Sequence, residues 1–176
     1  NYIKYLFETF GADTTVVNVD ALTYAGNLLN LKEVDQYPNY HFYRVDIADR
    51  AALKTVFEAQ PIHEIVHFAA ESHVDRSIMD GSIFVKTNVL GTENLLSLAK
   101  ECDVKKFVHV STDEVYGALG EEGLFTEASP LEPTSPYSAS KTASDLLALA
   151  YFRTHGMNVS VTRCSNNYGP YQFPEK

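Results

Sequence analysis

Two short stretches of the sequence carry residues that could do chemistry together. Thr112, Asp113 and Glu114 come directly after an apolar, strand-like run, so they lie where a buried strand would leave a sheet. Tyr137 and Lys141 are four residues apart and would share one face of a helix. A lysine ammonium favours the phenolate of a nearby tyrosine and lowers its pKa, which would make Tyr137 a general base. Two adjacent carboxyl groups can donate one proton and accept another at the same substrate.

Each motif also has a plainer interpretation. Tyrosine and lysine at this spacing are common on helix surfaces, and the chain has 11 tyrosines. Adjacent acids in a loop are often only solvated. Function is favoured because five successive strand ends carry small, polar or acidic residues, and ligands bind at the carboxyl ends of strands in an open α/β sheet. We therefore predict one active site formed by Thr112, Asp113, Glu114, Tyr137 and Lys141.

The composition is that of a globular protein. Of the 176 residues, 45% are hydrophobic, which favours a packed core. The net charge of −9, without a basic patch, argues against nucleic acid and against an anionic membrane surface as partners. No apolar run approaches membrane-spanning length, no signal peptide is visible, and two distant cysteines fit a reducing cytoplasm. The six histidines lack metal-ligand spacing, so we predict no metal site.

Apolar periodicity predicts alternating strands and helices. The predicted strands are Thr14–Asp20, His41–Asp46, Glu64–Ala70, Lys106–Val110 and Val159–Cys164, and the predicted helices are Ile3–Phe10, Leu28–Val34, one capped by Asp49, Ser82–Cys102 and Pro136–His155. This alternation of near-continuous apolar strands with helices is typical of a parallel sheet covered on both faces. The predicted fold class is α/β, a doubly wound Rossmann-like parallel sheet. Because the chain opens inside a helix and stops in a loop, we expect it to be truncated at both ends.

Acidic and small residues at other strand ends would suit a dinucleotide. Asp20 ends a strand that follows a helix, where an acid accepts hydrogen bonds from the adenosine ribose and repels the 2′-phosphate of NADP. Asp46 and Ile47 could flank the adenine, and the small residues after Phe68 could let the backbone approach a cofactor. Helix caps, solvated turns and close packing of strand on helix are the alternatives. The Gly-rich turn that would confirm a dinucleotide site is absent from the sequence.

These motifs together resemble the extended short-chain dehydrogenase/reductase family that acts on nucleotide sugars, and most of all its dTDP-glucose 4,6-dehydratases. The resemblance covers essentially the whole chain and is carried by residues 20–27, 69–75, 111–117, 137–141 and 163–176. The Tyr-x-x-x-Lys pattern is shared by the whole superfamily. The Asp113-Glu114 pair is more discriminating, because relatives that epimerise or decarboxylate sugar nucleotides generally lack it. Ala21 departs from the pattern, since relatives often have lysine there.

The resemblance implies NAD as cofactor, and it implies site residues by matching position. Cofactor contacts would come from Asp20, Ala21, Leu22, Thr23, Asp46, Ile47, Phe68, Ala69, Ala70, Ser72, Thr87, Tyr137, Lys141 and Asn167. Substrate contacts would come from Ser72, Thr112, Asn166 and Lys176. Residues 1–176 would be a partial NAD-binding domain, with the first strand and most of the C-terminal substrate-binding part outside the chain. The family also implies a homodimer through the helices at 82–102 and 136–155.

The implied reaction is the NAD-dependent dehydration of dTDP-glucose to dTDP-4-keto-6-deoxyglucose. Tyr137 would take the C4 hydroxyl proton while Thr112 hydrogen-bonds the C4 oxygen. Glu114 would remove the C5 proton, and Asp113 would protonate the departing C6 hydroxyl. Two alternatives stay open: another NAD-dependent sugar-nucleotide epimerase or decarboxylase, and a non-catalytic dinucleotide-binding regulator. The thymidine base rests on the resemblance alone.

Overall fold

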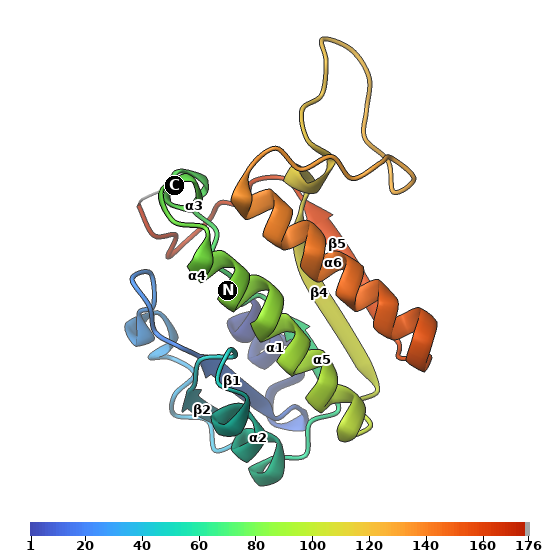
Figure 1. Ribbon diagram of the computed structural model, residues 1–176. Coiled ribbons are helices and arrows are strands. Elements are labelled where there is room, and N and C mark those ends of the chain that lie inside the picture. Colours follow the sequence, from blue (N-terminus) through green and yellow to red (C-terminus); the bar gives the residue numbers. More distant parts are fainter. Residues whose placement is uncertain (175–176) are drawn as a thin grey trace.

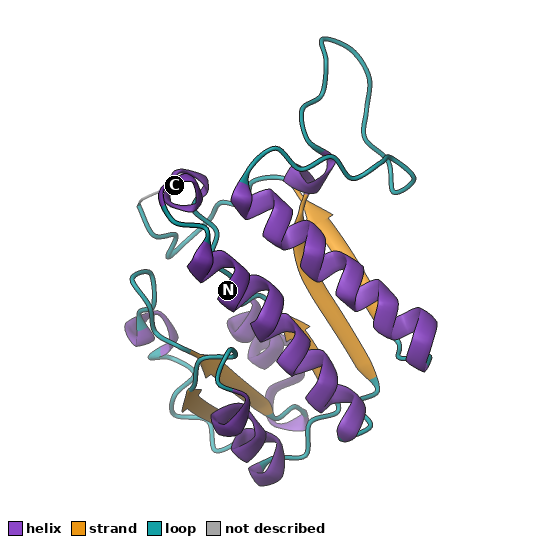
Figure 2. Cartoon of the chain, in the orientation of Figure 1, coloured by secondary structure: helices purple, strands orange, loops and turns teal. Residues whose placement is uncertain are grey.

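The computed structural model describes residues 1–174 and alternates strands with helices (Figures 1 and 2). The strands are β1 (Val16–Asp20), β2 (Tyr40–Arg44), β3 (Glu64–His67), β4 (Lys106–Thr112) and β5 (Val159–Cys164). The α-helices are α1 (Tyr2–Phe10), α2 (Arg50–Ala59), α3 (Val74–Met79), α4 (Ser82–Phe84), α5 (Thr92–Glu101) and α6 (Pro136–His155). The remaining helical turns are η1 (Gly11–Asp13), η2 (Leu28–Leu31), the π-helix η3 (Val85–Gly91) and η4 (Asp113–Tyr116). The predicted α/β class is confirmed.

The strands form two parallel sheets. In one, β1 pairs with β2, with Val16 opposite Tyr40. In the other, β4 lies between β3 and β5, with Phe107 opposite Val159. Within residues 1–174 no described strand pairs with both β1 and β3, so the strands form two groups. The arrowheads of both sheets nevertheless point to the same side of the molecule, so the strand ends share one edge (Figure 1).

Helices cover both faces of these strands. Figure 1 shows α2, α5 and α6 in front of the strands and α1 behind them. The main core is the cluster under α2, α5 and α6, which includes Leu53, Leu96, Phe107 and Ala148. A second cluster of Phe7, Val16 and Val34 lies beneath α1. The helix-covered parallel sheets of the prediction are therefore present in both halves of the chain.

Local signals fix the longest helix. The Ser135 side chain accepts a hydrogen bond from the Ser138 N–H, and Ser138 returns one in a capping box. Pro136 occupies the first turn, where its missing N–H costs nothing. Gly156 ends the helix in the left-handed conformation with φ +67°. Helix α6 therefore has the predicted bounds, and Tyr137 lies in its first turn.

The predicted helix at 82–102 is interrupted, and one helix was not predicted. The segment runs as α4, η3 and α5, with η3 in π geometry, and π turns are frequent at functional sites. Helix α3 is too short for apolar periodicity to reveal it. Strand β3 ends at His67, earlier than predicted, so the next residues form a loop. None of the described helices is long and apolar enough to cross a membrane.

Candidate active site

Thr112 links the two predicted catalytic stretches. It is the last residue of β4 and is buried, and its Oγ1 accepts a hydrogen bond from the Glu114 N–H at 3.2 Å. The same hydroxyl lies 3.4 Å from Asp113 Oδ1 and also hydrogen-bonds the side chain of Tyr137. Thr112 therefore joins the acidic pair on η4 to the phenol on α6, which places four of the five predicted catalytic residues together.

Lys141 lies one turn beyond Tyr137 on α6, as predicted, and its side chain is turned to the strand. Its Nζ donates a hydrogen bond to the Val110 carbonyl oxygen at 2.9 Å. The backbone N–H of Tyr137 donates to Ser77 Oγ at 3.1 Å, which ties the start of α6 to α3. Phe84 packs edge-on against the Tyr137 ring, with centroids 6.3 Å apart. Both functional side chains are thus held by buried contacts.

The predicted lowering of the Tyr137 pKa is wrong for this structure. Burial raises the pKa of Tyr137 to about 12, and the negative charges of Glu114 and Asp113 add to the rise, although the bond to Thr112 opposes it. Burial also lowers the pKa of Lys141 to about 8, against attraction to Asp145 and Cys164. The lysine does not offset the two acids because its ammonium is directed at Val110.

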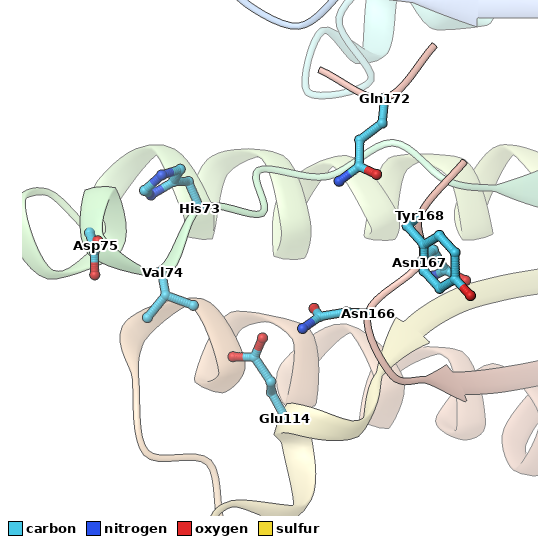
Figure 3. Close-up of a pocket in the computed structure, with 8 residues that line it drawn as sticks. All are labelled: His73, Val74, Asp75, Glu114, Asn166, Asn167, Tyr168 and Gln172. Atoms are coloured by element: carbon cyan, nitrogen blue, oxygen red, sulfur yellow. The ribbon is translucent and has the colours of Figure 1, made fainter. Parts of the chain in front are cut away.

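The two acids face different hollows. Glu114 lines a cavity of about 430 Å³ with His73, Val74, Asp75, Asn166, Asn167, Tyr168 and Gln172. Figure 3 shows the Glu114 carboxylate and the Asn166 amide pointing toward one another in this cavity. Asp113 lines a second hollow of about 420 Å³ with Tyr116, Phe125, Arg163 and neighbours. The two acids therefore line separate hollows, although they are adjacent on η4.

The predicted substrate residues that the structure describes lie at or after the ends of β3, β4 and β5. Thr112 and Asn166 lie at the ends of β4 and β5, and Asn166 lines the cavity itself. Ser72 lies in the loop after β3 and is half-buried. Asn167, predicted near the cofactor, lines the same cavity, and its Nδ2 donates to Cys164 Sγ at 3.1 Å. Lys176 lies outside the described residues.

The predicted ribose-binding acid has an accessible position. Asp20 ends β1, is exposed, and accepts a hydrogen bond from the Leu22 N–H at 2.7 Å through Oδ1. Leu22 itself has φ +52°, and a turn follows at residues 24 and 25. Asp46 Oδ1 accepts a hydrogen bond from the Ala48 N–H at 2.9 Å. Its Oδ2 forms an ion pair with Lys86 Nζ at 3.2 Å. Both acids therefore also have the turn-forming role that was the plainer alternative.

The side chain of Ile47, predicted to flank the adenine of a cofactor, is buried. Ile47 is 5% exposed and packs into the main core, where a side chain at Gly91 would clash with it. Its carbonyl oxygen accepts a hydrogen bond from Asn94 Nδ2 at 2.9 Å. The side chain of Ile47 thus has a structural role, and its contact with a cofactor stays a prediction.

An asparagine that the sequence did not single out fixes the loop after β3. Asn88, on η3, is buried and exchanges two hydrogen bonds with the backbone of Glu71, at 2.8 and 2.9 Å. Its Nδ2 also donates to Ser140 Oγ on α6 at 2.8 Å. The loop residues Phe68, Ala69, Ala70 and Ser72, with the half-buried Thr87 beside Asn88, are therefore held against α6. The sequence held no clear signal for Asn88, because polar residues such as Lys86, Thr87 and Asn94 lie close to it in the same helical segment.

The family model described as GDP-mannose 4,6 dehydratase matches residues 1–176. The chain belongs to the GDP-mannose 4,6-dehydratase family. Among its curated relatives, a dTDP-glucose 4,6-dehydratase of Streptomyces griseus is 56% identical over 99% of this chain and 52% of its own length. One from Neisseria meningitidis serogroup B is 54% identical over 92% of this chain and 48% of its own length.

Solved structures of a dehydratase and of an epimerase resemble this chain as well. A dTDP-glucose 4,6-dehydratase from Streptomyces venezuelae, solved with NAD and TYD bound, has a TM-score of 0.92 and 52% identity. It covers 99% of this chain, which covers 54% of that structure. A UDP-glucose 4-epimerase from Thermus thermophilus, in complex with NAD, has a TM-score of 0.88 and 30% identity, covering 98% of this chain and 53% of its own. The chain spans about half the length of the curated relatives it matches. The predicted resemblance to dTDP-glucose 4,6-dehydratases is confirmed.

Proposed function

We propose that the complete protein is an NAD-dependent dTDP-glucose 4,6-dehydratase. The observation that carries this proposal is the Thr112-Asp113-Glu114 turn joined to Tyr137 through the Thr112 hydroxyl. An acid, a base, a hydroxyl and a phenol at one strand end are what an oxidation coupled to elimination needs. The high identity to proteins named dTDP-glucose 4,6-dehydratases supports the substrate.

The described residues fit NAD as the cofactor. The exposed Asp20 carboxylate at the end of β1 suits the two hydroxyls of an adenosine ribose and disfavours a 2′-phosphate. The loop after β3 offers Ala69 and Ala70, whose small side chains leave its backbone approachable. Asn88 holds that loop in place. The chemistry that NAD+ supplies when bound is acceptance of the hydride from C4 of the sugar and its return to C6.

The first step assigned to the chain is removal of the C4 hydroxyl proton by Tyr137. Thr112 would donate a hydrogen bond to the C4 oxygen, because its hydroxyl already lies against the Tyr137 side chain. Since Glu114 and Asp113 raise the Tyr137 pKa, the phenol can act as a base only where positive charge offsets them. Because the Lys141 ammonium is directed at Val110 here, bound NAD+ would supply that charge, or Lys141 would turn toward the phenol.

The second step is elimination of water across C5 and C6. A ketone at C4 makes the C5 hydrogen acidic, and Glu114 would accept that proton. Asp113 would donate a proton to the C6 hydroxyl, which leaves as water as the C5–C6 double bond forms. The two acids line separate hollows, which suits one group that acts at C5 and another that acts at C6. The 4-keto-6-deoxy sugar nucleotide then forms when the hydride returns to C6 and a proton returns to C5.

The proposal is tested by mass spectrometry of dTDP-glucose incubated with the complete protein and a trace of NAD+. Loss of one water per sugar without net NADH formation is the expected result. An unchanged mass with a new stereocentre at C4 would make the protein an epimerase instead. An unaltered substrate would remove dTDP-glucose from the proposal, and the UDP, GDP and CDP sugars would be tested next.

We also propose that the complete protein is a homodimer through the helices at 82–102 and 136–155. Exposed apolar side chains lie along them, including Ile83, Val85, Leu90, Leu146 and Phe152. The two helical segments pack side by side, so these side chains can form a four-helix interface between two copies (Figure 1). A Leu146→Glu variant should sediment as a monomer. A control with glutamate at an equally exposed loop leucine should stay dimeric, and a monomeric unmodified protein would refute the proposal.

A cytoplasmic location is the remaining proposal. Cys102 and Cys164 are both free in the structure, and reduced cysteines fit a compartment rich in thiol reductants. Fractionation of cells that express the tagged complete protein tests this. Recovery in the cytosolic fraction is expected, and recovery with membranes or outside the cell would contradict it.

A further inference from the structure

One arginine connects the two elements that carry the acidic pair and the phenol. Arg163 lies on β5, where Nε donates to Asp145 Oδ2 on α6 at 2.8 Å. Its Nη1 donates to the Tyr116 hydroxyl on η4 at 2.9 Å. The planar guanidinium makes both bonds at fixed relative angles, which a lysine cannot do. Arg163 therefore sets the position of η4 relative to α6.

The α6 end of this connection is buried and charged. Asp145 is fully buried, two turns beyond Tyr137 on α6. Burial alone would raise the pKa of Asp145, but His109, Ser111 and Arg163, which face it, hold the pKa below its ordinary value. Burial lowers the pKa of His109, so that ring is neutral and Arg163 carries the charge paired with Asp145. A buried carboxylate paired in this way anchors the guanidinium firmly.

The η4 end is the turn that carries the predicted acid and base. Tyr116 is 7% exposed, and its ring stacks on Phe125 with centroids 5.1 Å apart. The Arg163 guanidinium also lies over this ring, 5.1 Å from its centre. Tyr116 is three residues beyond Asp113 and two beyond Glu114 in the same single turn. A shift of the Tyr116 hydroxyl therefore moves both carboxylates.

We propose that Asp145, Arg163 and Tyr116 form a positioning chain that sets the Asp113-Glu114 pair relative to Tyr137. This inference rests on the proposed dehydratase function, and none of the three residues need touch the sugar. The chain acts on the elimination step, because its far end is η4. Oxidation at C4 depends on Tyr137, which α3 and Phe84 hold independently.

The test is Tyr116→Phe in the complete protein, which removes the hydroxyl and keeps the ring stacked on Phe125. Single-turnover NADH absorbance measures oxidation, and quenched mass spectrometry measures loss of water. Oxidation should stay within about twofold, and elimination should slow by about ten- to hundredfold, since a hydrogen bond to a charged group is lost. The 4-keto sugar that still has its C6 hydroxyl should accumulate. Arg163→Lys should give the same split.

Tyr151→Phe is the matched control. Tyr151 is also on α6, and its hydroxyl donates to Glu93 at 3.1 Å, away from the site. Its removal should leave both rates unchanged. Equal slowing of oxidation and elimination in Tyr116→Phe, or no slowing of either, would overturn the positioning role while the dehydratase function stands. If the unmodified protein forms no dehydrated product, the proposed function fails first and the positioning role with it.

Discussion

Lys141→Met should make the protein's stability less dependent on pH. Lys141 is 3% exposed, and burial lowers its pKa from 10.5 to about 8, with Asp145 and Cys164 offsetting part of the effect. In the unfolded chain the group regains its ordinary pKa. Between these two values the unfolded state binds more protons than the folded state, so stability rises with pH. Below pH 8 the buried cation is a fixed cost to folding.

The size of the effect follows from the shift. A difference of about 2.5 pKa units (10.5 minus 8) corresponds to about 3 kcal/mol at about pH 7, and about 1 kcal/mol of that cost remains at about pH 9.5. The unmodified protein should therefore gain about 2 kcal/mol relative to Lys141→Met over this range. The lost hydrogen bond to Val110 is the same at both pH values, so it drops out of the comparison.

The assay is urea unfolding of the cofactor-free complete protein at both pH values. Lys54→Met is the control, because its ammonium lies at the surface of α2 and the corresponding difference should be much smaller. If the free energy of unfolding changes with pH by the same amount in the unmodified protein and in Lys141→Met, the reasoning is refuted. That result would mean that the Lys141 cation is not destabilised by its surroundings.

Four further substitutions test the site and its support. Tyr137→Phe should slow single-turnover NADH formation by about 10²–10⁴-fold, the usual contribution of a general base, and unaltered NADH formation would remove Tyr137 from that role. Glu114→Gln should suppress incorporation of solvent deuterium at C5, measured by mass spectrometry, and undiminished incorporation would assign the C5 proton to another base. Gly117→Ala should cost about 3 kcal/mol in denaturant unfolding, because φ is +86° and a Cβ would lie 2.3 Å from the Glu132 carbonyl oxygen. Gly156→Ala, with φ +67° and open space around it, should cost only about 1 kcal/mol, and equal costs would show that the contact at Gly117 is unimportant.

Local chemistry made much of the fold predictable. Pro136, Ser135 and Gly156 determine both ends of α6 through interactions within a few residues, and Asp49 caps α2 in the same way. The sheet was less predictable, because pairing depends on which strands meet in space. Strand order predicted the parallel sheet, but it could not predict that the described strands pair as β1-β2 and β3-β4-β5. The π geometry of η3 could not be predicted either, because a single π turn leaves no distinct spacing of apolar residues in the sequence.

The sequence predicted which residues meet at the site, but it did not predict the direction in which the pKa of Tyr137 shifts. Thr112, Tyr137 and the acidic pair come together because strand ends share one edge. The pKa of Tyr137 depends on burial and on acids brought near it from another element, which spacing along α6 cannot reveal. Asp145 and Arg163 were missed for the same reason: each reads as a surface charge until the structure places them 2.8 Å apart with Asp145 buried.

The loop at residues 118–135 is closed at its base, and this affects how freely its length can change. Glu132 donates its N–H to the Val115 carbonyl at 3.0 Å, and Gly117 lies directly against Glu132. The chain between these points projects from the molecule (Figure 2). Doubling the length of a flexible loop costs only about 0.6 kcal/mol in closure entropy. Insertions near Gly120 can therefore be accommodated, such as a peptide tag or a fluorophore site, without moving the turn that carries Asp113 and Glu114.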